Sequence, residues 1–304
     1  KPPGLPNAYP KLPIANGMKY FSNRPRAYSY LKEFKQDVLD GYDCFTVGES
    51  PMTTPEIALR YVTEGEGQVL QEMIGFSHME ADCFMTDVVQ RPFNLVKMKK
   101  AFSHWQYALQ GKAWNALYIE NHDHPRIISR YGSERYHKES GKMLAAMYAL
   151  QRGTPFLYQG QEIGMLNIKL ADLKLYQDVM TRNNARLLSR LMPRSQVLKL
   201  VQKSSRDSAR TPMQWTAGRN AGFSTGVPWF FVNPNYTEIN VEAQEKDPDS
   251  ILNFYRKAVA LRRALPVVRD GSYREFKRAS DVHYFYVRES DDEKLLVMCS
   301  FASK

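Results

Sequence analysis

Cysteine is scarce in this chain, which has only Cys44, Cys83 and Cys299 among its 304 residues. An odd number of widely spaced cysteines does not fit a disulfide framework, and their spacing matches no metal site. Two of them lie in or beside apolar runs, so we expect buried thiols in a reducing compartment. Apolar stretches long enough to span a membrane are missing, as is a secretory signal peptide. These absences predict a cytoplasmic protein with no membrane partner, no bound metal and no cofactor.

Acidic residues are outnumbered, because 42 Lys and Arg face 32 Asp and Glu and leave a net charge of +10. Such an excess raises the hypothesis of a nucleic-acid partner. The basic residues are scattered, however, and the densest runs, 97–100 and 206–210, are short. The sequence also lacks zinc-knuckle spacing and an RNA-binding aromatic block. A diffuse positive charge is more typical of a solvated surface, so no nucleic-acid partner is expected.

The most informative stretch is residues 114–132, WNALYIENHDHPRIISRYG. An apolar strand at 116–119 ends abruptly in Glu120, Asn121, His122 and Asp123. A strand that is apolar on both faces is typical of parallel sheets, whose carboxyl ends carry the ligand site. The triplet Asn121-His122-Asp123 is therefore a candidate site, although a polar loop with an Asn or Asp cap is an alternative.

The order Asn-His-Asp, then Pro-Arg and Ser-Arg over residues 121–130, resembles the fourth signature region of the α-amylase superfamily (glycoside hydrolase family 13). More narrowly, it is similar to the α-glucosidase and oligo-1,6-glucosidase branch. The resemblance implies that Asp123 is the carboxylate that stabilises the transition state. It also implies that Asn121 and His122 contact the sugar.

A second carboxylate follows another short apolar run, Thr46-Val47-Gly48-Glu49. A glutamate at the carboxyl end of a strand, beside a glycine, is a candidate general acid, because partial burial keeps a carboxyl group protonated toward neutral pH. A surface glutamate at the start of a loop is the alternative. The run resembles the third signature region of the same superfamily, which implies that Glu49 is the acid/base.

Two further segments resemble this branch. Residues 206–215, RDSARTPMQW, are similar to the loop after the last barrel strand, which implies that Arg210 binds the sugar with Arg206 in support. A guanidinium group can hold a carboxylate or donate to sugar oxygens. Residues 153–162 resemble the last barrel strand, and we interpret Glu162 as structural. Where the family usually has Phe-Glu-His-Met, this chain has FSHM at 76–79, so we expect His78 to be packed instead of catalytic.

Strand-like and helix-like segments alternate, with strands expected at 43–47, 69–76, 116–119 and 154–158. This alternation predicts an α/β fold. A closed (β/α)8 TIM barrel needs eight strands and about 250 residues. We therefore expect residues 1–268 to be its C-terminal half, strands five to eight. After a helix at 249–265, capped by Asp247 or Asp249, short β-rich segments predict the start of a truncated all-β domain at 269–304.

The resemblance implies a retaining α-glucoside hydrolase acting on short isomalto- or malto-oligosaccharides. Trehalose-6-phosphate hydrolase, sucrose isomerase and a non-catalytic superfamily member are the alternatives. The chain starts Lys1-Pro2-Pro3 without an initiator Met, so we expect a fragment that lacks the N-terminal half and the nucleophilic aspartate. We therefore expect this fragment alone to be inactive, and to self-associate through unpaired strand edges.

Overall fold

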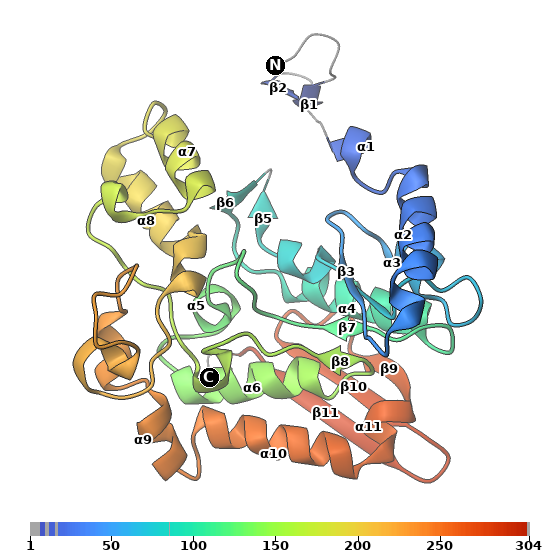
Figure 1. Cartoon of the computed structure of the whole chain (residues 1–304). Coiled ribbons are helices and arrows are strands. Elements are labelled where there is room, and N and C mark those ends of the chain that lie inside the picture. Colours follow the sequence, from blue (N-terminus) through green and yellow to red (C-terminus); the bar gives the residue numbers. More distant parts are fainter. Residues whose placement is uncertain (1–6, 10–11, 16–17, 85, 303–304) are drawn as a thin grey trace. The chain divides into compact units, whose positions relative to one another are not determined.

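The structure, a computed structural model, describes residues 7–9, 12–15, 18–84 and 86–302 (Figure 1). They form two compact units. The first contains the described residues up to Ser77 together with His104–Ala116, and the second contains His78–Ser103 and the residues from Leu117 onward. The helix α4 (Leu95–Leu109) contributes residues to both units.

The first unit holds most of the N-terminal elements. They are β1 (Asn7–Tyr9), β2 (Leu12–Ala15), α1 (Met18–Phe21), α2 (Pro25–Asp37), the 3-10 helix η1 (Leu39–Gly41), β3 (Val47–Glu49), α3 (Pro55–Val62) and β4 (Glu72–Ile74).

The second unit holds a larger set of helices and strands. They are η2 (Ser77–Glu80, whose first residue belongs to the first unit), β5 (Cys83–Phe84), β6 (Thr86–Gln90), β7 (Ala116–Leu117, likewise shared), α5 (Ile127–Tyr131), α6 (His137–Ala149), β8 (Thr154–Pro155), η3 (Gln161–Ile163), η4 (Leu173–Leu175), α7 (Val179–Leu188), α8 (Arg194–Ser204), η5 (Arg206–Arg210), η6 (Arg219–Gly222), η7 (Pro234–Thr237), α9 (Val241–Lys246), α10 (Ile251–Ala264), α11 (Pro266–Asp270), β9 (Ser272–Phe276), β10 (His283–Glu289) and β11 (Lys294–Ser300).

In the first unit, β3 and β4 pair in parallel, with Gly48 opposite Met73. A Cβ atom on Gly48 would lie 2.6 Å from the Cδ1 carbon of Leu70, so a larger residue here would require that side chain to shift. The helix α3 follows β3, and the hydroxyl oxygen of Thr54 caps it by accepting a hydrogen bond from the Ile57 amide. The buried face of α3 packs with the β4 region and with the end of α4. This is a strand–helix–strand unit with its own apolar core.

The first strand is shorter than expected and lies later in the chain. We expected it at 43–47, but β3 covers Val47–Glu49, and Phe45 is exposed. Its partner β4 has only three residues, so the ladder of hydrogen bonds ends where the partner ends.

The expectation of buried cysteines fails for two of the three. Cys44 is exposed and Cys83 is half-buried, and only Cys299 is buried.

In the second unit, β7 pairs with β8 in a separate two-stranded sheet. Both strands are shorter than expected, although the chain stays buried beyond β7 through Tyr118 and Ile119. Among the described residues, the β3–β4 and β7–β8 pairs do not join into one sheet, so no closed barrel forms. The α/β fold is confirmed, whereas the half-barrel interpretation stays a prediction.

The expected β-rich segments near the C-terminus form an antiparallel sheet in the order β11-β10-β9. The helix α6 packs against β11 and against α10, which lies beside it (Figure 1). The buried Arg288 donates to the carbonyl oxygens of Leu150, Val268 and Gly271, so the sheet is fixed to the rest of the second unit. A domain boundary at residue 268 therefore stays a prediction.

The last long helix is capped differently from our expectation. Its N-cap is Ser250, whose hydroxyl oxygen accepts from the Asn253 amide at 3.1 Å, and not Asp247 or Asp249. Both aspartates instead pair with lysines of α6. In the part of the chain that the structure describes, no helix is long and apolar enough to cross a bilayer.

Candidate active site

The segment after β7 leaves the core as a tight polar turn. The side-chain oxygen of Asn121 accepts from the Asp123 amide at 3.0 Å and lies 2.8 Å from Nδ1 of His124. His122 is exposed, Asp123 is half-buried and His124 is buried. The turn thus presents His122 and Asp123 outward while Asn121 and His124 hold its shape. The side-chain oxygen of Asn121 contacts residues of its own turn, so sugar binding by Asn121 stays a prediction.

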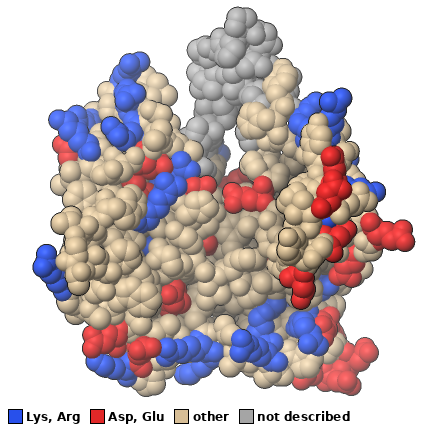
Figure 2. All heavy atoms as spheres, in the orientation of Figure 1, with Lys and Arg blue, Asp and Glu red and all other residues tan. Residues whose placement is uncertain are grey.

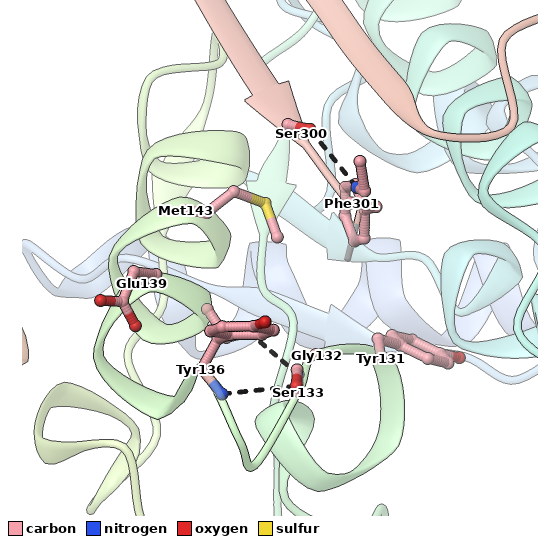
Figure 3. A pocket seen from close by; sticks show the side chains of 10 residues that line it. Tyr131, Gly132, Ser133, Tyr136, Glu139, Met143, Ser300 and Phe301 are labelled. Atoms are coloured by element: carbon pink, nitrogen blue, oxygen red, sulfur yellow. Dashed lines mark hydrogen bonds between the residues drawn. The ribbon is translucent and has the colours of Figure 1, made fainter. Parts of the chain in front are cut away.

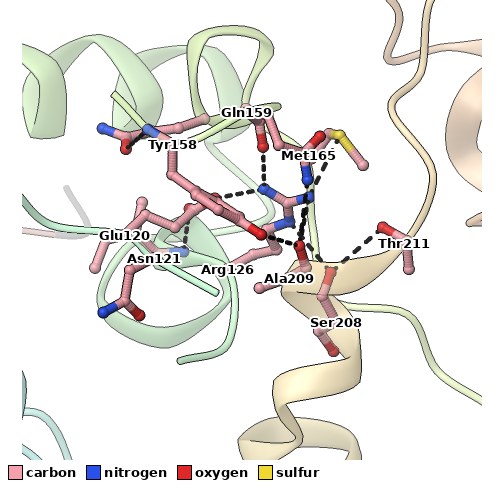
Figure 4. Close-up of polar contacts among 12 residues, drawn as sticks. Glu120, Asn121, Arg126, Tyr158, Gln159, Met165, Ser208, Ala209 and Thr211 are labelled. Carbon is pink, nitrogen blue, oxygen red and sulfur yellow. Dashed lines mark hydrogen bonds and ion pairs between the residues drawn. The ribbon is translucent and has the colours of Figure 1, made fainter. Parts of the chain in front are cut away.

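A buried arginine of this turn, paired with Glu120, links the turn to the segment after β8 and to η5. The guanidinium of Arg126 contacts the Glu120 carboxylate at 2.6 Å, and both side chains are almost fully buried. Arg126 also donates to the carbonyl oxygens of Gln159, Ser208 and Ala209 (Figure 4). One side chain therefore joins three segments that the sequence places far apart. Sequence reasoning noted Arg126 but gave it no role.

Two arginines of η5 converge on the half-buried Asp123. Arg206 and Arg210 each place one guanidinium nitrogen near the same Asp123 oxygen, at 2.8 and 2.9 Å. Arg210 also donates to the main-chain oxygen of His122 at 2.9 Å. The other Asp123 oxygen lies 3.7 Å from Nε2 of His122. The second unit therefore brings together His122, Asp123, Arg206 and Arg210, which all come from the sequence prediction.

Asp178 completes this cluster, and sequence reasoning missed it. One of its oxygens lies 3.0 Å from Arg206 and 3.4 Å from Arg210, while its side chain is only 2% exposed. Its other oxygen accepts from the Thr181 amide at 2.7 Å and so caps α7. Although burial alone would raise it, the pKa of Asp178 is lowered, because Thr181 donates hydrogen bonds and Arg206 carries a positive charge. An aspartate directly before a helix was the available signal, but it indicates only a cap.

A second carboxylate fixes the segment that carries Asp178. The buried Asp207 accepts from the main-chain amides of Gln177 and Asp178, at 2.8 and 3.1 Å. The cations and anions of the cluster thus alternate, and each guanidinium group lies between Asp123 and Asp178. A small cavity beside the cluster is lined in part by Asp123, Asp178 and Arg206. The arrangement fixes one oxygen of Asp123 and leaves the other facing His122.

Glu49, the remaining predicted catalytic residue, belongs to the first unit. It ends β3, and its side chain is exposed. Asn23 holds the loop that follows, since its carbonyl oxygen accepts from the hydroxyls of Ser50 and Thr53, both at 3.0 Å. The described residues therefore do not supply the burial that we expected for a general acid. Its role as the acid/base stays a prediction.

Two other sequence interpretations can be compared with the structure. His78 is packed, as expected: its ring lies 4.7 Å from those of Phe102 and Tyr118, and burial lowers its pKa to about 3. Glu162 is half-buried, and burial raises its pKa.

One hollow of the second unit lies away from the predicted site residues. A hollow of about 470 Å³ lies between α6 and the end of β11, where Tyr136, Met143 and Phe301 line it (Figure 3). None of the predicted site residues lines it. The described residues also contain no group of His, Cys, Asp and Glu side chains suited to a metal ion.

Comparison with known proteins identifies the family. A model of the α-amylase catalytic domain matches residues 5–271. The chain belongs to the α-amylase family. It is 39% identical to the oligo-1,6-glucosidase of Parageobacillus thermoglucosidasius, in an alignment that covers 100% of this chain and 55% of the relative.

Solved structures of this family agree with the fold. The crystal structure of Bacillus licheniformis trehalose-6-phosphate hydrolase superposes with a TM-score of 0.90 at 39% identity, covering 95% of this chain and 53% of that one. The isomaltulose synthase of Erwinia rhapontici NX5 gives a TM-score of 0.89 at 29% identity, covering 98% and 55%. The chain thus has an α/β α-amylase catalytic-domain fold and spans about half the length of the relatives it matches.

Proposed function

We propose that this chain carries the acid/base Glu49 and the transition-state stabiliser Asp123 of a retaining α-glucoside hydrolase. The observation that supports this most directly is the grip of Arg206 and Arg210 on one oxygen of Asp123 in a chain of the α-amylase family. Oligo-1,6-glucosidases among its relatives are glycoside hydrolases. The proposed substrates are short isomalto- or malto-oligosaccharides.

Each residue has a distinct role in this proposal. Glu49 protonates the glycosidic oxygen as the bond breaks and later takes a proton from water. Asp123 accepts hydrogen bonds from sugar hydroxyls through the oxygen that the arginines leave open, and His122 donates to a neighbouring hydroxyl. Because Arg206 and Arg210 hold Asp123 in one orientation, little reorganisation is needed when charge develops on the sugar. We assign the nucleophile to no residue of this chain, and in a retaining enzyme it would lie about 5 to 5.5 Å from the acid.

Two relatives define the alternatives within the branch. Trehalose-6-phosphate hydrolase and isomaltulose synthase both share the fold over almost the whole chain. A panel of isomaltose, maltose, trehalose 6-phosphate and sucrose distinguishes these activities. We expect isomaltose to be cleaved, because oligo-1,6-glucosidases are 39–41% identical to this chain. Trehalose 6-phosphate is the first alternative, since the hydrolase of known structure is 39% identical.

The test uses a hybrid in which this chain replaces the aligned part of the Parageobacillus oligo-1,6-glucosidase. Isomaltose is the substrate of choice, since its poor leaving group depends on proton donation. We expect Glu49→Gln to lower kcat about 10²–10⁴-fold, while Glu66→Gln, at an exposed glutamate of the same unit, leaves it unchanged.

We expect Asp123→Asn to lower kcat by about 10²–10³-fold, as does removal of one electrostatic stabiliser in other enzymes. The matched control is Asp292→Asn, at an exposed residue in the β10–β11 turn. A folded hybrid that hydrolyses isomaltose equally well with either catalytic carboxylate neutralised would refute the proposal.

A further inference from the structure

The most one-sided charge in the second unit lies on α7, α8 and their connection, residues 179–204, here called the basic hairpin. Of the chain's 42 Lys and Arg it contains six, and it contains none of the 32 Asp and Glu. The six are Arg182, Arg186, Arg190, Arg194, Lys199 and Lys203. Figure 2 shows blue side chains gathered over this hairpin at the upper left. The charge is therefore concentrated locally, even though the chain as a whole has scattered charges.

In the part of the chain that the structure describes, most of these cations form no ion pair with a carboxylate. All six side chains are exposed, and only Arg194 forms an ion pair with a carboxylate, that of Asp172, among the described residues. Arg182 and Arg186 are four residues apart and lie along one side of α7, and Arg190 follows in the turn after the helix. Lys199 and Lys203 have the same spacing on α8. A row of unpaired cations favours an anionic partner with repeated charge.

The same hairpin exposes apolar side chains next to the arginines. Met180, Leu187 and Leu191 are 42%, 52% and 75% exposed. Leu187 follows Arg186, and Leu191 follows Arg190 at the turn between the helices. The opposite side of the hairpin is already occupied, because Ala185, Val197 and Val201 are buried in a core cluster. The exposed Leu187 and Leu191 therefore lie outside this core cluster.

We propose that the basic hairpin binds the surface of an anionic lipid bilayer. Lys and Arg near such a surface are attracted by its negative potential, and exposed Leu and Met side chains enter the boundary between headgroups and acyl chains. Nucleic acid fits less well, because the sequence has no aromatic residue between Tyr176 and Trp215 on which bases could stack. Absence of a spanning helix does not bear on this mode of binding. The proposal revises our expectation of no membrane partner and is independent of the proposed hydrolase activity.

Flotation of the full 304-residue chain with vesicles tests the proposal, since bound protein rises with the lipid while aggregates sink. Vesicles of phosphatidylcholine with phosphatidylglycerol are compared with phosphatidylcholine alone. We expect binding to the anionic vesicles only, and release at about 1 M salt, where screening acts within about 3 Å. The variant Arg186→Gln with Arg190→Gln is expected to bind about 25-fold more weakly, at about fivefold per lost charge.

The control variant carries Lys257→Gln and Arg263→Gln, which remove two exposed charges from α10. It has the same net charge as the hairpin variant and should bind like the unmodified chain. Leu187→Ser with Leu191→Ser should weaken binding about tenfold or more if these side chains leave water. No flotation, equal binding to neutral vesicles, or equal weakening in the control would overturn the proposal. The proposal would also be overturned if the chain bound duplex DNA more tightly than anionic vesicles and Arg186→Gln with Arg190→Gln weakened that binding.

Discussion

His78 is buried between the rings of Phe102 and Tyr118, and its burial makes folding sensitive to pH. Loss of solvation lowers the pKa of His78 from 6.5 to about 3. Below pH 6.5 the unfolded chain binds a proton that the folded chain excludes. The stabilising contribution of a neutral His78 is therefore complete above pH 6.5 and is lost as the pH falls toward 3.

The size of the effect follows from these two pKa values. At pH 5 the unfolded histidine is almost fully protonated and the folded one is neutral, so this group should lower the free energy of unfolding by about 2 kcal/mol relative to neutral pH. His124 acts in the same direction, because burial, with Arg130 nearby, lowers its pKa to about 3. Half-buried Glu162 acts in the opposite direction, since its pKa is raised. The net pH dependence of the chain is a sum, so only a comparison of variants isolates His78.

The assay is urea unfolding of the unmodified chain and of His78→Phe at pH 7 and pH 5, with His104→Gln as the exposed control. Phenylalanine keeps an aromatic ring in the buried site and cannot titrate. We expect the unmodified chain and the control to lose about 2 kcal/mol more between the two pH values than His78→Phe loses. If all three chains lose the same stability within a few tenths of a kcal/mol, the reasoning from burial is wrong.

Four further outcomes are expected. Arg126→Met should destabilise the chain by about 3–5 kcal/mol in urea unfolding, because Glu120 stays buried without its counterion, and adding Glu120→Leu should recover part of that loss. Asp178→Ala should cost about 1 kcal/mol more than Asp178→Asn, since asparagine keeps the cap on α7; equal costs would exclude the cap. The chain alone should release no p-nitrophenol from p-nitrophenyl α-glucoside. If it released p-nitrophenol faster than its Glu49→Gln variant does, the expectation that the chain lacks the nucleophile would be wrong. Sedimentation velocity should show oligomers, because two-stranded sheets leave open edges; a single monomeric species would argue otherwise.

Much of the local structure followed from residue order. The α/β alternation and the β-rich segments between residues 272 and 301 were predicted from spacing and residue type. The short range of the signals explains this success, because an alternating strand is encoded within a few consecutive residues. The same holds for the polar triplet after β7, whose family resemblance agrees with the match to the α-amylase catalytic domain.

Tertiary structure alone decided which charged groups meet. Asp123 is 83 residues from Arg206, and Arg126 joins carbonyl oxygens up to 83 residues away, so no local pattern could identify these partners. It also decided exposure: Glu49 and Cys44 follow or lie in apolar runs yet face solvent. Burial depends on what the rest of the chain places above a side chain, whereas sequence spacing specifies only which residues share a face.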